Sequence, residues 1–152
     1  MILNVKRLQP HAKLPTIAHP GEDLGYDVYA LEDIELNPFN MVSVRTGIAI
    51  EAGEHPRQLL QTCSAERFGF LIRDRSSMAK AGVAVFGGVI DAGYRGEIFV
   101  TLRNMFNTVF LIHAGDKIAQ LIPVPVFAGR VEEVGTLSDS CRRDKAFGSS
   151  GK

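Results

Sequence analysis

Cysteine is scarce in this 152-residue sequence, which contains only Cys63 and Cys141. The two lie far apart and match no metal-ligand or redox spacing, so we interpret them as free thiols of a protein in a reducing compartment. Long apolar runs are also missing. The N-terminus has no stretch of signal-peptide length, and no later segment approaches the roughly 20 apolar residues of a membrane helix. These absences predict a cytoplasmic protein with no membrane partner.

Neither sign of charge predominates in the sequence. Seventeen basic and 17 acidic residues give a formal net charge of zero. Because binding to a phosphate backbone needs several Lys or Arg contacts on one face, this balance predicts no nucleic-acid partner. An anionic ligand must instead be held by a local cluster of bases. The length and the 45% hydrophobic content are those of one globular domain with a core of its own.

Helical periodicity is rare, whereas short segments rich in β-branched and aromatic residues recur between Gly, Pro, Asn and Asp. Such segments are typical of strands, and they include 42–45, 48–50, 98–103 and 124–127. Many short strands predict an all-β sandwich, barrel or jelly roll. One short helix is expected at 76–81, begun by a serine cap and ended by Gly82.

Composition divides the chain into two parts. Residues 1–137 are expected to form a single β domain. Residues 138–152 are polar and rich in Gly and Ser, which is typical of a flexible C-terminal tail. Residues 51–70 are the least readable part of the domain, and they fit either an elaborated hairpin or a loop with a helical turn.

Three stretches could carry chemistry in the first two thirds of the chain. Residues 87–98, GGVIDAGYRGEI, interrupt a strand-like pattern with an acid, a glycine and a tyrosine. Residues 21–27 place three carboxylates near two glycines, a pattern that suits a turn as easily as a metal site. Residues 75–77, Arg-Ser-Ser, open the expected helix, where backbone N–H groups, hydroxyls and the guanidinium can bind phosphate. An ordinary helix cap explains the two serines equally well.

Two further stretches lie toward the C-terminus. Residues 115–122, GDKIAQLI, alternate polar and apolar residues like a half-buried strand after a tight turn, which leaves only the choice of Gln120 unexplained. Residues 142–151, RRDKAFGSSG, combine bases, one aromatic and a Gly-Ser run. A solvated tail is the default interpretation, although Phe147 has no obvious purpose in one.

Together and in this order, the five stretches resemble the motifs of the homotrimeric deoxyuridine triphosphatases (dUTP diphosphatases, dUTPases). GYDVYA is similar to the first motif, RSSMA to the second, GGVIDAGYRGEI to the third, GDKIAQLI to the fourth and RRDKAFGSSG to the fifth. The resemblance covers the chain from about Gly21 to Gly151. It implies a jelly-roll-like or distorted β-barrel subunit that hydrolyses dUTP to dUMP and pyrophosphate, in a homotrimer with shared active sites.

The resemblance also implies roles for residues of the third motif. This motif forms a β-hairpin in the family, and its backbone, including Gly88, would hydrogen-bond the uracil edge. Tyr94 would pack under the deoxyribose and exclude a 2′-hydroxyl. Asp91 would be the general base that deprotonates the water attacking the α-phosphorus.

The other motifs would hold the triphosphate and close the site. The resemblance assigns phosphate contacts to Arg75, Ser76, Ser77 and Gln120, and a water-mediated contact to Mg²⁺ to Asp27. The tail would close over bound substrate and exclude water. Its expected contributions are a γ-phosphate contact from Arg142, cover for the uracil ring from Phe147, and further substrate contacts from Gly148 and Ser149.

Two departures from the family pattern favour an alternative. Gly93 stands where many dUTPases have a second acid, and Ser77 stands where they have glycine. At both positions the sequence resembles that of the dCTP deaminases, which include bifunctional forms that also cleave the triphosphate. Deamination needs a glutamate ten residues after the motif aspartate, however, and this chain has Thr101 there, which cannot act as a carboxylate base. A non-catalytic jelly-roll module that binds nucleotides is a third hypothesis, and it predicts a degraded site, whereas every assigned position keeps a competent side chain.

Overall fold

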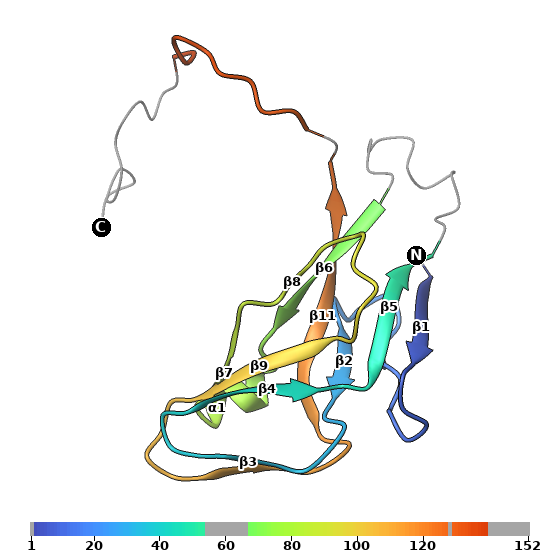
Figure 1. Ribbon diagram of the computed structural model, residues 1–152, viewed down its shortest axis with the longest axis vertical. Coiled ribbons are helices and arrows are strands. Elements are labelled where there is room, and N and C mark those ends of the chain that lie inside the picture. Colours follow the sequence, from blue (N-terminus) through green and yellow to red (C-terminus); the bar gives the residue numbers. More distant parts are fainter. Residues whose placement is uncertain (1, 54–66, 128, 140–152) are drawn as a thin grey trace.

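The computed structural model describes residues 2–53, 67–127 and 129–139. Within these ranges the chain forms strands and one short helix, so the all-β prediction is confirmed (Figure 1). The elements are β1 (Leu3–Arg7), β2 (Tyr26–Tyr29), β3 (Ile34–Leu36), β4 (Met41–Arg45), β5 (Ile48–Ala52), β6 (Arg67–Arg73), α1 (Ser76–Lys80), β7 (Val83–Phe86), β8 (Val89–Ile90), β9 (Phe99–Asn104), β10 (Phe110–Ile112) and β11 (Lys117–Val126).

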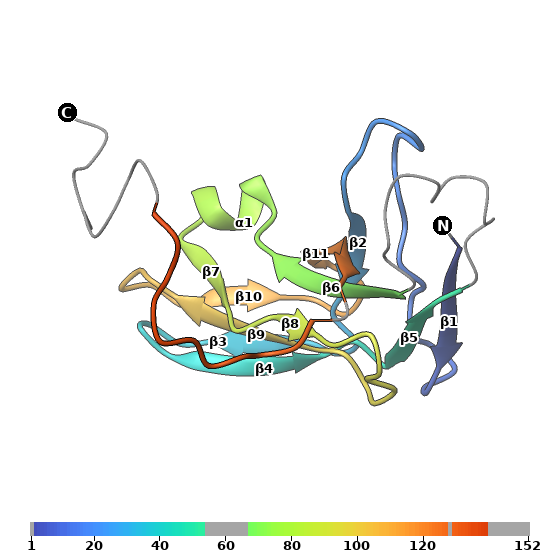
Figure 2. The same ribbon diagram turned by 90° about the horizontal axis from the view of Figure 1, so that it is seen from above.

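Two main sheets contribute to one core. The first has the strand order β2-β11-β6-β8 and the second β4-β9-β7, and the pairs β1-β5 and β3-β10 complete the domain. Figure 2 shows β6 and β11 on one side of the domain and β4 and β9 on the other. Ile72 and Leu121 of the first sheet and Val44 and Val100 of the second belong to one buried apolar cluster. Burial alternates along β9, as expected for a strand with one face toward a core.

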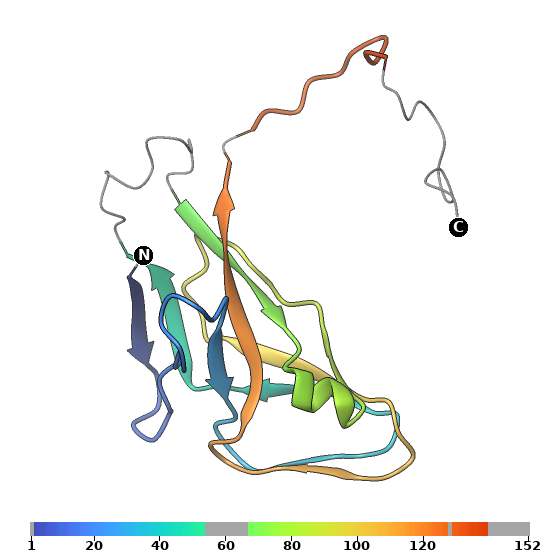
Figure 3. The ribbon, with the colours of Figure 1, turned by 180° about the vertical axis from the view of Figure 1, so that it is seen from behind.

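Strand β11 brings distant parts of the sequence together. Two stretches expected to be strands, 115–122 and 124–127, are parts of this one long strand, which begins after a turn at Gly115 (φ 85°). It lies between β2 and β6 (Figure 3). Gln120 is the register partner of Asp27 in β2 and of Arg73 in β6. The first and fourth motifs therefore meet on β11, and the second motif begins two residues after Arg73.

The helix is confirmed, but its expected serine cap is wrong. Arg75 is the N-cap residue and has extended backbone angles, while Ser76 is already helical. No side chain caps the helix, and the Ser77 hydroxyl accepts a hydrogen bond from the Arg75 guanidinium instead. Gly82, with φ of 76°, follows the last turn as predicted. No helix in the described ranges has the length and apolar character needed to cross a membrane.

The third motif lies at the end of a β-hairpin. The strands on either side of it, β7 and β9, pair antiparallel with each other, while β8 within the motif pairs with β6 of the first sheet. The change of sheet begins at Gly87 and Gly88, which both have positive φ. A side chain at Gly88 would also meet the carbonyl oxygen of Ile72 at 2.8 Å. The glycines permit this change of sheet within the hairpin.

Residues 51–70 and the C-terminal tail are described only in part. Strand β5 ends at Ala52 and β6 begins at Arg67, and residues 54–66 between them lie outside the described ranges. After β11, residues 129–139 form no strand and extend away from the sheets in Figures 1 and 3. The expectations for Cys63, Cys141 and the tail from residue 140 onward fall on residues that the structure does not describe.

Candidate active site

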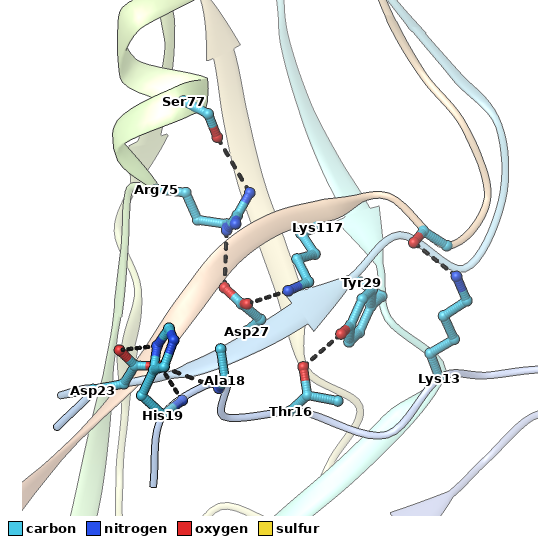
Figure 4. A network of polar contacts seen from close by, with 11 residues as sticks. Lys13, Thr16, Ala18, His19, Asp23, Asp27, Tyr29, Arg75, Ser77 and Lys117 are labelled. Atoms are coloured by element: carbon cyan, nitrogen blue, oxygen red, sulfur yellow. Dashed lines mark hydrogen bonds and ion pairs between the residues drawn. The ribbon is translucent and has the colours of Figure 1, made fainter. Parts of the chain in front are cut away.

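Asp27 lies between two cations at the wall of a polar pocket. Its Oδ1 accepts a hydrogen bond from Arg75 Nε at 2.8 Å, and its Oδ2 lies 2.7 Å from Lys117 Nζ (Figure 4). The pocket has a volume of about 290 Å³ and is also lined by Ser76 and Gln120. We call it the Asp27 pocket. It collects residues of the expected first, second and fourth motifs on one surface.

Strand register explains how these side chains meet. Asp27 and Gln120 are opposite each other on β2 and β11, and Arg75 follows β6, the strand on the other side of β11. Gln120 Nε2 donates to the carbonyl oxygen of Asp74 at 3.0 Å, while the Asp74 side chain accepts the N–H of Val85. Asp74 thus contacts both the pocket glutamine and Val85 within β7. No sequence signal had distinguished this residue.

Lys117 is the cation that the sequence analysis missed. Asp27 raises the pKa of the Lys117 ammonium, mainly by accepting its hydrogen bond and also through charge attraction. The stabilisation from this pair is therefore fully present below the ordinary lysine pKa and is lost only as the pH rises through the elevated value. Lys117 is accordingly a cation at neutral pH. Its place two residues after Gly115, at the start of a strand, had no feature that pointed to Asp27.

The opposite wall of the Asp27 pocket is a turn. Asp23 accepts hydrogen bonds from the backbone N–H groups of Ala18 and His19 at 3.1 and 2.8 Å, and Gly21 has φ of 90°. The His19 N–H is the largest cause of a lowered pKa for the Asp23 carboxyl. That stabilisation is present above the ordinary carboxyl pKa and is lost as the pH falls through the lowered value. The turn interpretation of residues 21–27 is the one that the structure supports.

Asp91, Tyr94 and Gly88 line a second pocket of about 280 Å³, here called the Asp91 pocket. Asp91 is exposed, so its carboxylate is open to water. A turn follows it, in which the Tyr94 N–H donates to the Asp91 carbonyl at 2.9 Å. The Tyr94 hydroxyl donates to the carbonyl of Glu97, also at 2.9 Å. Phe86 and Phe99 supply apolar walls.

Two arginines secure the turn between Asp91 and Glu97. Arg95 Nη1 donates to the carbonyls of Ala92 and Tyr94 at 2.9 and 2.8 Å, and its Nε lies 3.0 Å from a Glu51 carboxylate oxygen. Arg45 binds the Glu97 carboxylate through Nε and Nη2, at 3.0 to 3.3 Å. Glu97 raises the pKa of the Arg45 guanidinium through that hydrogen bond and through charge attraction. The contacts of Arg95 with Glu51 and of Arg45 with Glu97 join residues distant in the sequence, so the local sequence had not indicated them.

The two pockets have no lining residue in common. Arg75, Ser76, Gln120 and Asp27 line one, whereas Gly88, Asp91 and Tyr94 line the other. Ser77 contacts Arg75 at the edge of the first. The remaining predicted site residues, Arg142, Phe147, Gly148 and Ser149, lie outside the described ranges. A single chain therefore presents two separate groups of predicted site residues.

A direct protein cage for a metal is not found among the described residues, where no three His, Cys, Asp or Glu side chains are grouped to bind an ion. Asp27 is the predicted metal-contacting residue, and each of its oxygens already has a cationic partner. A carboxylate oxygen can accept more than one hydrogen bond, so Asp27 can still contact a metal-bound water. This arrangement fits Mg²⁺ that keeps several waters and takes other ligands from phosphate.

A sequence model of the dUTPase family matches residues 11–151. The chain belongs to this family. Curated relatives agree over nearly the whole length. The deoxyuridine 5′-triphosphate nucleotidohydrolase of Clostridium tetani is 40% identical over 153 residues, covering 99% of this chain and 97% of the relative. The protein of the same name from Gloeothece citriformis is 41% identical over 154 residues, covering 99% and 97%.

Solved dUTPase structures match the fold. The dUTPase of Staphylococcus bacteriophage 80alpha, solved with dUpNHpp, has a TM-score of 0.81 and 26% identity, with 99% of each chain covered. The dUTPase of Staphylococcus aureus phage phi11 has a TM-score of 0.75 and 22% identity, covering 91% of this chain, and its mutant is described with a structural Mg(II) ion. At that identity the second likeness concerns the fold alone. The predicted jelly-roll-like dUTPase fold is confirmed.

Proposed function

We propose that this member of the dUTPase family hydrolyses dUTP to dUMP and pyrophosphate. The observation that carries the proposal is the division of its motif residues between two pockets. One presents an exposed carboxylate beside a tyrosine and apolar walls, and the other presents two cations, a serine and a glutamine. The first suits a nucleoside and an attacking water, and the second suits a triphosphate.

Asp91 acts as the general base in this mechanism. Its exposed carboxylate accepts a proton from water, and the water oxygen attacks the α-phosphorus. The bond from that phosphorus to the oxygen bridging toward the β-phosphorus breaks, and pyrophosphate leaves with the electron pair. The Arg95 and Glu97 contacts hold the Asp91 turn in place, which matters because a positioned base and water need little further reorganisation. Tyr94 packs against the deoxyribose.

The triphosphate lies in the Asp27 pocket. Arg75 supplies charge-assisted hydrogen bonds, Ser76 and Ser77 supply hydroxyls, and Gln120 supplies the amide hydrogen that Asp74 does not use. Mg²⁺ is the expected cofactor, and Asp27 would contact it through a water. When bound, it would neutralise phosphate charge that increases in the transition state.

The deaminase alternative is not favoured. Thr101 occupies the position where the deaminases need glutamate, and it lines the Asp91 pocket with its hydroxyl 2.9 Å from Ser43 Oγ. Glu97 also lines this pocket, but its carboxylate is occupied by Arg45 and by the Gly47 N–H. Neither residue can move protons at a cytosine ring as a free carboxylate. The curated relatives from Clostridium tetani and Gloeothece citriformis are also named as dUTP hydrolases, not as deaminases.

A nucleotide panel tests the proposed activity. We expect dUMP and pyrophosphate from dUTP, little product from UTP, and no ammonia from dCTP. Nucleotides separated by chromatography, pyrophosphate by a coupled assay and ammonia by an enzymatic assay give the three results. Ammonia release from dCTP would replace the proposal with the deaminase, and no turnover of any nucleotide would favour the non-catalytic module.

The active enzyme is a homotrimer in which one subunit's Asp27 pocket meets another subunit's Asp91 pocket. The separation of the two pockets on one chain supports this arrangement, because neither group of residues makes a complete site. The tail, residues 138–152, completes the site through Arg142, Phe147, Gly148 and Ser149. A cytoplasmic location and the absence of nucleic-acid and membrane partners stay predictions.

Mixing two inactive chains should restore activity if sites are shared. One chain carries Asp91→Asn, and the other ends before Arg142. In mixed trimers the two lesions can fall in different sites and leave another site intact. Activity is measured after co-refolding differently tagged chains and isolating species that contain both tags, and sedimentation checks the trimer. No rescue in isolated mixed trimers, or an active monomer, would contradict the shared site.

A further inference from the structure

We propose that Lys117 is a positioning residue for triphosphate binding, holding Asp27 so that Arg75 can direct its terminal nitrogens and its charge toward phosphate. The inference rests on the proposed function and extends it to a residue without an assigned role. Figure 4 shows the arrangement: Asp27 lies between Arg75 on one side and Lys117 on the other. The three residues come from β2, the N-terminal edge of α1 and the first position of β11.

The contact atoms determine which part of Arg75 is available. Asp27 takes the Nε of the guanidinium at 2.8 Å, and among the described residues the other partner of Arg75 is the Ser77 hydroxyl, which accepts from Nη1. A guanidinium has five N–H donors. The terminal nitrogens therefore keep donors for a ligand in the pocket that Arg75 lines. Asp27 acts as a side support for the guanidinium and leaves its end open.

Charge balance gives Lys117 its second effect. Arg75 and Asp27 alone would make a neutral pair, and an approaching phosphate would have to compete with the carboxylate for the guanidinium. Lys117 lies 2.7 Å from the other Asp27 oxygen. It gives the group of Asp27, Arg75 and Lys117 a net charge of one positive unit. The side chains of Asp27, Arg75 and Lys117 are 18%, 28% and 38% exposed, so water screens their interactions less than on an open surface.

Removing Lys117 would change the pocket in a definite way. Asp27 Oδ2 would lose its cation, and the partly buried carboxylate would repel phosphate while interacting more strongly with Arg75. Asp23 also lines the pocket, so two carboxylates would then be balanced by the Arg75 guanidinium alone. Anion affinity should fall even though Arg75, Ser76 and Gln120 are all present.

The test measures binding of inorganic tripolyphosphate to the full-length protein by calorimetry, in EDTA and at low salt. Lys117→Met should weaken binding roughly tenfold, the equivalent of about one strong charge-assisted contact, and the deficit should shrink at high NaCl because salt screens charge. Lys117→Arg should retain most of the affinity. With dUTP and Mg²⁺, Lys117→Met should raise KM much more than it lowers kcat.

Lys13→Met is the matched control. Lys13 donates to the Gly115 carbonyl at 3.0 Å and lies over the Tyr29 ring, so this variant removes one cation near the same turn but outside the pocket. It should bind tripolyphosphate like the wild type. If Lys117→Met does not fold, Lys117→Gln is the substitute, because it keeps a hydrogen-bond donor while losing the charge.

Two outcomes would overturn the inference. A folded Lys117→Met or Lys117→Gln protein with wild-type tripolyphosphate affinity would show that Lys117 does not support the pocket. An equal loss of tripolyphosphate affinity in Lys13→Met would show that the effect comes from the net charge of the protein and not from the position of Lys117. Neither outcome depends on dUTP turnover: a wild type that binds tripolyphosphate but fails the nucleotide panel would overturn the proposed function and leave the role of Lys117 to be judged by the binding data.

Discussion

Replacing Asp91 with Asn should lower turnover of dUTP roughly 10²- to 10⁴-fold, the usual contribution of a general base. Asn keeps the size of the side chain but cannot accept the proton from the attacking water. Asp91 is exposed at the pocket wall, so the substitution should cost little stability. The measurements are steady-state kinetics with dUTP and Mg²⁺, and calorimetric binding of dUpNHpp, which should be close to the wild-type value.

Asp33→Asn is a suitable control for the Asp91 variant. The Asp33 side chain is 76% exposed and lies outside both site pockets, where it accepts the N–H of Ala114. Its loss should leave kcat unchanged. Near wild-type turnover in the Asp91→Asn protein would remove Asp91 from the role of base. A parallel loss of dUpNHpp affinity would instead point to a defect in substrate positioning.

Deleting residues 138–152 should abolish most of the activity while leaving the thermal stability nearly unchanged. The buried core of the described chain ends with β11 at Leu121, so the deletion removes none of its members. The family resemblance, in contrast, places Arg142 and Phe147 on the substrate. Differential scanning calorimetry and steady-state kinetics on the truncated chain measure the two effects. Full activity in the truncated protein would show that the tail has no part in the site.

Single substitutions separate the contributions within the tail. Phe147→Ala should lose the aromatic cover over the base, where stacking of this kind is worth roughly 1–3 kcal/mol. Arg142→Ala should lose a charge-assisted phosphate contact and be less sensitive to which base is present. Hydrogen exchange should show greater protection of the tail amides with dUpNHpp and Mg²⁺ than without ligand. Equal protection in both conditions would contradict closure over the substrate.

Strand prediction succeeded where the local pattern is strong. The alternation at 98–103 and the β-branched run at 42–45 became β9 and β4, with small shifts at their ends. Gly82 follows the helix and Gly115 forms the turn before β11, both as expected. Each has positive φ, which costs little only at glycine. The serine cap was wrong because the helix begins one position earlier than expected: Arg75 is the N-cap residue, and Ser76 already has helical geometry.

The candidate site was predictable as a set of residues but not as a geometry. Asp91 and Tyr94 were assigned from the third motif, and both line one pocket. Strands β7 and β9 form the arms of a hairpin around them, but the pairing of β8 with β6, which joins part of the motif to the other sheet, was not predicted. Which strand a short segment joins depends on the path of the whole chain, since both alternatives satisfy the same backbone hydrogen bonds.

Residue order alone was enough to establish the all-β class, the family and the side chains with suitable chemistry, because strand periodicity, turn glycines and motif order are local properties of the chain. Only the folded chain decided that Asp27 would lie between Arg75 and Lys117, that Arg95 would contact Glu51, and that the motifs would divide between two pockets. Those contacts join side chains separated by about 40 to 90 positions. They depend on strand register and on which sheets share a core, and a carboxylate has no feature in its own sequence neighbourhood that selects one distant cation over another.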